Sequence, residues 1–276
     1  MTSCALSQSP IQYAIELVAA SLIQLTHLGA LILAVNAAPK DVALPRILRL
    51  PLITALFTTI MAALFCWFSY ERHPHVPDEV VYQHHARYLA EGLFTLPPAP
   101  VPAAFDIDLM EYEPTRWYSP VPPGWPAVLT LGALIGAPWL INPLLAGLNV
   151  LLTRRLLGHL YSRRVATASA VLLAASPWSL FLGMSLMTHQ FTLTGALAGA
   201  VGVAESRRSG SLMWAVIAGV GIGITSLIRP LDGVIVGLLI GGWAIGIGGK
   251  RLRFAALVAL AAGTPLTGAL VFPYNK

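Results

Sequence analysis

The sequence alternates between long apolar stretches and short polar turns. A helix needs roughly 20 apolar residues to cross about 30 Å of hydrocarbon. The stretches at 11–35 and 51–70 reach that length, and we expect each to form a membrane span. Beyond a long polar segment, 71–125, six more apolar stretches predict helices. They cover residues 140–157, 165–184, 191–204, 212–228, 231–249 and 254–272.

The segment 126–139 is apolar as well, but Gly136 and Pro138 interrupt it. A complete crossing there would place the arginines at 154–164 on the same side as the segment 71–125. We therefore interpret 126–139 as a short interfacial or re-entrant piece that leads into the next span. The pattern predicts an all-α membrane protein, a multi-pass helical bundle of about seven or eight spans.

Composition places the chain among integral membrane proteins. Of its 276 residues, 56% are hydrophobic and 11% are charged, and the mean hydropathy is +0.72. A soluble domain carries about 25% charged residues. The net charge of +5 does not indicate a nucleic-acid partner, because the basic residues form short clusters at the ends of apolar runs. Membrane lipids are the expected surroundings.

Basic residues predict how the chain is oriented in the membrane. Cytoplasmic turns of membrane proteins carry an excess of Lys and Arg. If the basic clusters are cytoplasmic, the loop 71–125 and the turns 185–190 and 229–232 all face the other side. We therefore expect a protein of the cell (inner) membrane whose active site faces the extracytoplasmic side. The four clusters, which hold 12 of the 17 Lys and Arg residues, lie at 40–49, 154–164, 207–208 and 250–253.

The large extracytoplasmic loop, 71–125, holds most of the polar chemistry. Eight of the twelve acidic residues and four of the seven histidines lie there. A polar loop between hydrophobic spans is typical of a functional surface. Within it, Pro77 opens a helical pattern with one apolar face, which predicts an amphipathic helix along the outer membrane surface. The residues of this face are Tyr82, Ala86, Leu89 and Leu93.

Asp78 and Glu79 stand at the start of this predicted helix. An aspartate before a helix is a favoured N-cap that contributes roughly 1 kcal/mol, and Glu79 suits the positive first turn. A carboxylate at a helix start beside a membrane can also act as a general base, a role worth roughly 10²–10⁴-fold in rate. The two roles are compatible.

The same segment contains side chains that could bind a metal ion. His73 and His75, together with Asp78 or Glu79, offer metal-ligating groups. Nothing elsewhere in the chain completes a recognised ligand spacing. We therefore predict no defined metal site and no certain cofactor, and a divalent cation stays an open alternative.

Further polar residues stand at the ends of apolar runs. Arg116 and Tyr118 precede a proline-rich return to the membrane, where an aromatic belt is the simpler interpretation. Arg229 and Asp232 have the most apolar surroundings. A charge deep in the bilayer costs at least ~2.5–3.5 kcal/mol, so we expect an interface salt bridge, or Arg229 bound to an anionic headgroup such as a phosphate. His189 faces the same side.

Several motifs occur in the order and spacing of a known group of membrane enzymes. Asp78 and Glu79 in the first outer loop are followed by a Tyr–Ala–Leu helix and by Gly92. Through these residues and three longer stretches, the chain resembles the GT-C superfamily of polytopic glycosyltransferases. Within it, the resemblance is to the branch related to protein O-mannosyltransferases and lipid A aminoarabinose transferases. The resemblance covers roughly residues 51–275. The stretches are RWYSPVPPGWPAVLTLGALIGAPWLINPLL (116–145), SPWSLFLGMSLMTHQ (176–190) and SLIRPLDG (226–233).

The resemblance implies a sugar donor linked to polyprenyl phosphate and transfer, with inversion, to a lipid, glycan or protein acceptor outside the cytoplasm. It makes Asp78 the candidate base that takes the proton of the acceptor hydroxyl. Glu79 would assist or help to hold a cation. This acidic pair corresponds to a family motif of known role.

Other site residues are inferred from their side of the membrane and their charge. Arg229, Arg116 and His189 are candidates for binding the donor phosphate, because the leaving group carries a charge that needs compensation. Three more residues are candidate acceptor or loop contacts: Tyr82, Tyr118 and His85.

The chain also departs from the family pattern. Residues 1–50 predict an extra N-terminal membrane helix and a basic cytoplasmic loop before a GT-C-like domain at 51–276. Members of the family usually continue with more helices, so we expect a truncated or shortened relative that corresponds to the N-terminal part of the family domain.

Two other function classes stay open. A transporter or flippase of a lipid-linked or anionic solute usually has polar residues near the middle of the membrane and repeated halves. Here the ionisable residues gather at span ends and no inverted repeat is visible, although Glu16 and His27 are exceptions. A non-catalytic relative would bind the donor lipid without forming product.

Overall fold

The computed structural model describes residues 50–101, 104–105 and 107–266, and the single positions 11, 15, 18 and 22. The chain divides into two compact units, Met1–Arg46 and Ile47–Lys276. In the first unit the four described positions are helical and exposed. The rest of the predicted span 11–35, with Glu16 and His27, lies outside the described residues. The second unit contains all the elements below.

Helices make up most of the second unit, and the described strands form a single two-stranded antiparallel ribbon, which confirms the all-α class. The strands are β1 (Glu111–Tyr112) and β2 (Trp117–Tyr118). The helices are α2 (Leu50–Phe68), α3 (Pro77–Ala90), α4 (Gly124–Leu134), the 3-10 turn η2 (Pro138–Leu140), α5 (Ile141–Leu160), α6 (Arg163–Ala175), α7 (Pro177–Met184), α8 (His189–Ser209), α9 (Leu212–Ile228), α10 (Pro230–Ile245) and α11 (Phe254–Leu266).

Proline and glycine explain where two predicted apolar stretches break. The segment 126–139 contains most of the short helix α4, which ends at Leu134. Gly136, which follows, has a left-handed backbone conformation, and η2 then leads into α5. The stretch 165–184 forms two helices bent by 56°. Pro177 cannot donate an intrahelical hydrogen bond, and Ser176 before it is extended, so α6 ends there. The continuous helix predicted for 165–184 is therefore broken.

Two described helical segments are long and apolar enough to cross a membrane on their own: α2 and the segment Pro138–Leu160. The bent pair α6–α7 makes a third if it counts as one span. The apolar helices α4, α9, α10 and α11 are shorter, at 10–17 residues. Helix α8 has 21 residues but ends with Glu205, Arg207 and Arg208.

Small residues allow the last helices to approach closely. A Cβ atom added at Gly219 in α9 would lie 2.0 Å from the carbonyl oxygen of Leu260 in α11. One added at Gly221 would lie 2.5 Å from the carbonyl oxygen of Gly195 in α8. Both faces of α9 thus pack backbone against backbone, as is common where helices associate within a membrane.

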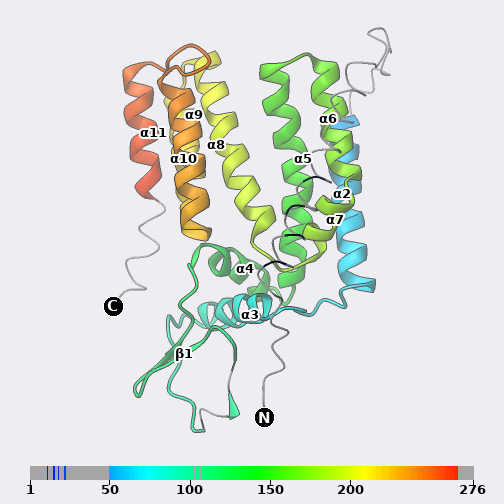
Figure 1. Cartoon of the computed structure of the whole chain (residues 1–276), viewed down its shortest axis with the longest axis vertical. Helices are drawn as coiled ribbons and strands as arrows, with labels where there is room; N and C mark the ends of the chain where they lie inside the picture. Colours follow the sequence, from blue (N-terminus) through cyan, green and yellow to red (C-terminus); the bar gives the residue numbers. More distant parts are fainter. Residues whose placement is uncertain are drawn as a thin grey trace. The chain divides into compact units, whose positions relative to one another are not determined.

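The turns and the loop occupy opposite ends of this helical unit (Figure 1). The turns α5–α6, α8–α9 and α10–α11, which carry three of the basic clusters, lie at one end. Helix α3, helix α4 and the β1–β2 ribbon lie at the other. We call these the basic end and the loop end. This separation agrees with the alternation expected from the sequence.

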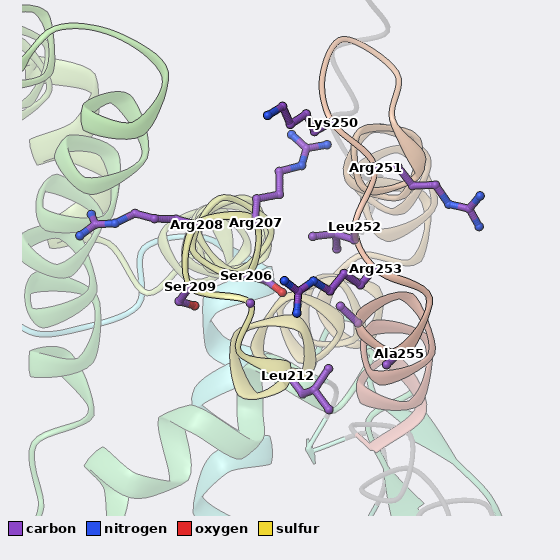
Figure 2. Close-up of a pocket in the computed structure, with 12 residues that line it drawn as sticks. Ser206, Arg207, Arg208, Ser209, Leu212, Lys250, Arg251, Leu252, Arg253 and Ala255 are labelled. Atoms are coloured by element: carbon purple, nitrogen blue, oxygen red, sulfur yellow. The ribbon is translucent and has the colours of Figure 1, made fainter.

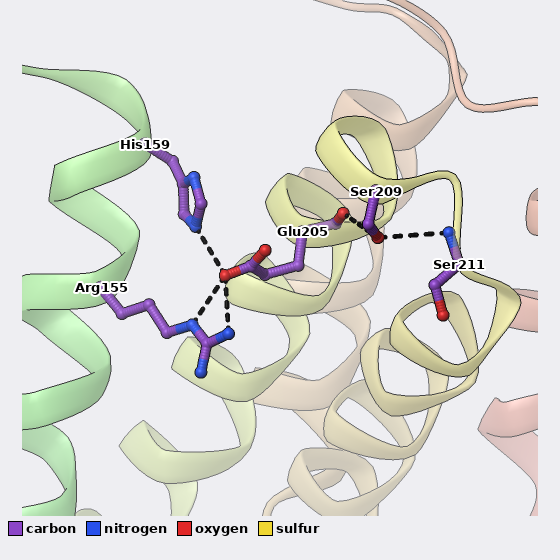
Figure 3. A network of polar contacts seen from close by, with 5 residues as sticks. All are labelled: Arg155, His159, Glu205, Ser209 and Ser211. Carbon is purple, nitrogen blue, oxygen red and sulfur yellow. Dashed lines mark hydrogen bonds and ion pairs between the residues drawn. The ribbon is translucent and has the colours of Figure 1, made fainter.

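At the basic end, a buried carboxylate joins α5 to α8 (Figure 3). The Oε1 atom of Glu205 accepts hydrogen bonds from Nε of Arg155 at 2.7 Å and lies 2.9 Å from Nε2 of His159. The Arg155 guanidinium also lies 4.7 Å from the centre of the Trp214 ring in α9. Three helices therefore meet around one ion pair.

Candidate functional site

The site candidates begin at the first turn of α3. Pro77 occupies the first helical position, and Val76, which precedes it, is the N-cap without a side-chain hydrogen bond. Asp78 is therefore inside the first turn, and its predicted N-cap role is wrong. On the predicted apolar face, Ala86 is buried and Tyr82 is partly buried, whereas Leu93 lies beyond the end of the helix and is exposed.

Glu79 is completely buried and fully hydrogen-bonded. Its Oε1 accepts from the backbone N–H of Leu186, and its Oε2 accepts from the backbone N–H of His75, each at 2.9 Å. The Tyr70 hydroxyl lies 2.9 Å from both oxygens. Burial, together with this bond, raises the pKa of Tyr70. Glu79 thus ties the start of α3 to the loop between α7 and α8.

That loop, residues 185–188, is also held from α4 and α5. The indole N–H of the buried Trp125 donates to the carbonyl of Leu186 at 2.8 Å. The side-chain amide of Asn142 donates to the carbonyls of Ser185 at 2.6 Å and Met187 at 2.8 Å. Buried side chains from three elements therefore fix the backbone that leads into α8.

Asp78 differs from its neighbour. It is partly exposed and, within the described part of the chain, accepts no hydrogen bond and forms no ion pair. It nevertheless lies close enough to Tyr82 to act on its ionisation: burial raises the pKa of Tyr82, the Asp78 charge adds to that rise and the Arg229 charge opposes it. Asp78 and Arg229 therefore both lie near the same phenol.

Arg229 links α9 to α10 in an extended conformation. Its Nε lies 3.1 Å from Oδ2 of Asp232, so the predicted salt bridge is present, and its side chain is 46% exposed. Burial lowers the pKa of His189, the Arg229 charge lowers it further and Asp232 opposes the change. The Nδ1 atom of His189 is buried and has no hydrogen-bond partner among the described residues. The Arg229 charge thus lowers the pKa of both Tyr82 and His189.

The remaining candidates lie in other surroundings. Arg116 pairs with Glu113 inside the β1–β2 ribbon, with Nε 2.8 Å from Oε2, and its guanidinium lies 4.9 Å from the ring centre of Tyr118. The Tyr118 hydroxyl donates to Glu113 at 3.1 Å. The Arg116 bond is the main reason that the pKa of Glu113 is lowered. No described contact joins Arg116 or Tyr118 to Arg229.

His85 points into the protein. Its side chain is completely buried and stacks on Tyr88, with ring centres 4.7 Å apart. Burial lowers the pKa of His85 to about 3, and His84 contributes in the same direction. The imidazole is therefore neutral near pH 7 and is covered by protein atoms rather than presented to an acceptor.

The histidines before α3 do not assemble a metal site in the described residues, where no group of three or more His, Cys, Asp or Glu side chains could hold an ion. His75 instead places Nε2 3.0 Å from the carbonyl oxygen of Tyr70 and packs its ring against that of Tyr70.

Sequence reasoning missed the buried amides that support the site. Asn149 in α5 donates to the backbone and side-chain oxygens of Gln190 at 2.9 and 2.8 Å, and accepts from Thr194 at 2.8 Å. Asn142 and Asn149 stand seven residues apart within an apolar run. Amides on one face of a membrane helix are costly without partners, and this spacing could have identified them.

No protein-family model matches the chain, and no curated protein is significantly similar to it in sequence.

Proposed function

We propose that this chain is a multi-pass membrane glycosyltransferase of the GT-C type. It moves a sugar from a polyprenyl-phosphate donor to a lipid, glycan or protein acceptor on the extracytoplasmic side of the cell membrane. One feature of the loop end supports the proposal: Tyr82, one turn after Asp78 in α3, packs against the same apolar cluster as Ile228, the neighbour of Arg229. In this proposal Asp78 is the base and Arg229 is the cation that binds the donor phosphate.

The proposed reaction is a single displacement. The acceptor hydroxyl loses its proton to the Asp78 carboxylate while its oxygen attacks the anomeric carbon. The bond from that carbon to the phosphate oxygen breaks on the opposite face, which inverts the configuration. Arg229 compensates the charge that develops on the leaving phosphate. His189, whose pKa is lowered mainly by burial, lies beside this site as a neutral imidazole near pH 7.

Glu79 acts as a positioning residue in this proposal. Its carboxylate is surrounded by three donors and is completely buried, so it does not reach a substrate. By holding α3 against the loop 185–188, it sets the place of Asp78 relative to His189. Arg116 and Tyr118 have a similar supporting role in the ribbon.

The proposal includes the finer membrane topology. The helices α8–α11 complete a bundle of seven or eight crossings with α2, α5 and the bent pair α6–α7. The basic end faces the cytoplasm. The loop end, with α3 lying along the outer surface, faces the donor lipid.

The decisive test is transfer by the full chain in membranes, with a panel of labelled polyprenyl-phosphate sugars. We expect the Asp78→Asn variant to lose transfer by at least roughly 10²-fold, with membrane insertion unchanged. Glu91→Gln is the matched control, because Glu91 is an exposed carboxylate at the other end of α3. Near-normal turnover by Asp78→Asn would remove Asp78 from the mechanism.

One observation favours a transporter as the second candidate. The pair α6–α7 is bent by 56° at Ser176 and Pro177, and transporters place substrate sites at broken helices. Flux of a labelled lipid across vesicles without formation of a glycosidic bond would support that function. Formation of a glycosidic product of inverted configuration would exclude it as the main activity.

A further inference from the structure

A pocket of about 650 Å³ lies at the basic end, between the α8–α9 turn and the α10–α11 turn (Figure 2). Five cationic side chains line it and no acidic one does. It is at the opposite end of the helical unit from α3 and the α9–α10 junction, which carry Asp78 and Arg229, so the proposed transfer reaction does not use it. The cations are Arg207, Arg208, Lys250, Arg251 and Arg253.

Two of the guanidinium groups reach from one turn to the other. A Cβ atom added at Gly249 would lie 3.1 Å from a terminal nitrogen of Arg207, and one added at Gly210 would lie 3.6 Å from a terminal nitrogen of Arg253. Figure 2 shows Arg207 directed toward Lys250, whereas Arg208 and Arg251 point away to either side. The inner cations of the pocket are therefore Arg207, Lys250 and Arg253.

Within the described residues, no acidic side chain pairs with these charges. Arg207 donates to the carbonyl of Trp243 and lies 4.5 Å from the centre of its ring, which holds the side chain in place. Its Nε is buried and has no partner in the part of the chain that the structure describes. The terminal nitrogens of Arg207 and Arg253, which reach toward the opposite turn, are the groups that an anion in the pocket can contact.

Exposed apolar residues lie at the starts of the two helices, α9 and α11, that border the pocket. Leu212 and Met213 at the start of α9 are 49% and 67% exposed, and Phe254 at the start of α11 is 75% exposed. Leu212 itself lines the pocket. A ligand that places a phosphate between the cations would thus continue along exposed apolar side chains.

We propose that this pocket binds the phosphate group of an anionic phospholipid. Arg207, Lys250 and Arg253 contact the phosphate oxygens, and the acyl chains lie along Leu212 and Phe254. Basic pockets between membrane helices on the cytoplasmic side are suited to such headgroups. A soluble phosphate would satisfy the cations but would leave the apolar side chains uncovered.

The test uses the full chain purified in an uncharged detergent, with binding followed by the shift in thermal unfolding. The probes are short-chain phosphatidylglycerol, short-chain phosphatidylcholine and inorganic phosphate. We expect saturable binding of phosphatidylglycerol only, weakened roughly tenfold by Lys250→Gln and by Arg253→Gln. Arg163→Gln is the matched control, since Arg163 is an exposed cation at the same end outside this pocket.

Three outcomes would overturn the proposal. The first is equal binding of the two phospholipids, and the second is an equal loss of affinity in Arg163→Gln. The third is inorganic phosphate that binds as tightly as phosphatidylglycerol, which would make this a site for a soluble anion. Asp78→Asn should bind the lipid normally, so failure of sugar transfer and failure of lipid binding are separate results.

Discussion

Asp78 and Glu79 are adjacent carboxylates with different environments. Successive side chains on an α-helix point in different directions, because the helix has 3.6 residues per turn. Glu79 faces the protein and accepts from Tyr70, His75 and Leu186, whereas Asp78 stays partly exposed. The sequence showed the pair, but it could not show which member is buried. That depends on Leu186, 107 positions away.

The Glu79→Gln substitution should lower the stability of the protein. Each carboxylate oxygen of Glu79 accepts from a different backbone N–H, so an amide NH₂ in either position opposes a donor. We expect a loss of roughly 1–3 kcal/mol, measured by thermal unfolding in detergent. Asp78→Asn should leave the unfolding temperature almost unchanged. Equal effects of the two variants would contradict the separation of roles.

At the scale of elements, some features followed from the sequence and others did not. The bounds of α9 agree with the prediction because Ser211 and Arg229 flank an uninterrupted apolar run. Pro177 is a sequence signal for the break between α6 and α7. The prediction of one helix over 165–184 followed the apolar character of the run instead. The polar contacts that hold the loop 185–188 come from α3, α4 and α5. Hydropathy carries no information about such distant partners.

The contact between α5 and α8 should weaken in acid. Burial alone would raise the pKa of Glu205, but the hydrogen bonds from Arg155 and His159 outweigh it, and the net shift is downward. Since the folded pKa lies below the unfolded value of about 4.3, the stabilisation is complete above that pH. It is lost as pH falls through the folded pKa.

The measurement is the unfolding temperature of the native chain and of Glu205→Gln between about pH 3 and pH 7. Because the Arg155 side chain is 49% exposed, the ion pair contributes no more than about 1 kcal/mol. We expect the difference between the two proteins to shrink toward the acidic end. A constant difference across the range would refute this account.

The close approach of α9 and α11 predicts a second effect. In Gly219→Ala the new Cβ would meet the Leu260 carbonyl at 2.0 Å, so the helices must separate. We expect a loss of roughly 1–3 kcal/mol. Gly241→Ala in α10 is the control, because its Cβ would meet nothing within 4 Å. The unfolding temperature should therefore fall in Gly219→Ala and rise slightly in Gly241→Ala, because alanine is a better helix former than glycine.

For the whole molecule, the separation of charge predicts the membrane topology. Single cysteines can replace Glu91 at the loop end and Arg163 at the basic end, in a chain whose Cys4 and Cys66 are changed to alanine. A membrane-impermeant maleimide should label position 91 in intact cells, and position 163 only after permeabilisation. Labelling of both positions from one compartment would invalidate the orientation and, with it, the assignment of Asp78 to an outer lipid surface.

The bond between Glu79 and the backbone of Leu186 has a consequence for biosynthesis. During translation α3 emerges long before Leu186, and until then the buried carboxylate of Glu79 lacks one of its two backbone donors, which makes its burial costly. Helix α3 is therefore expected to dock against the protein only after α4 to α7 have been inserted. The loop end is expected to close only when residues 185–188 have left the ribosome, late in the assembly of the chain.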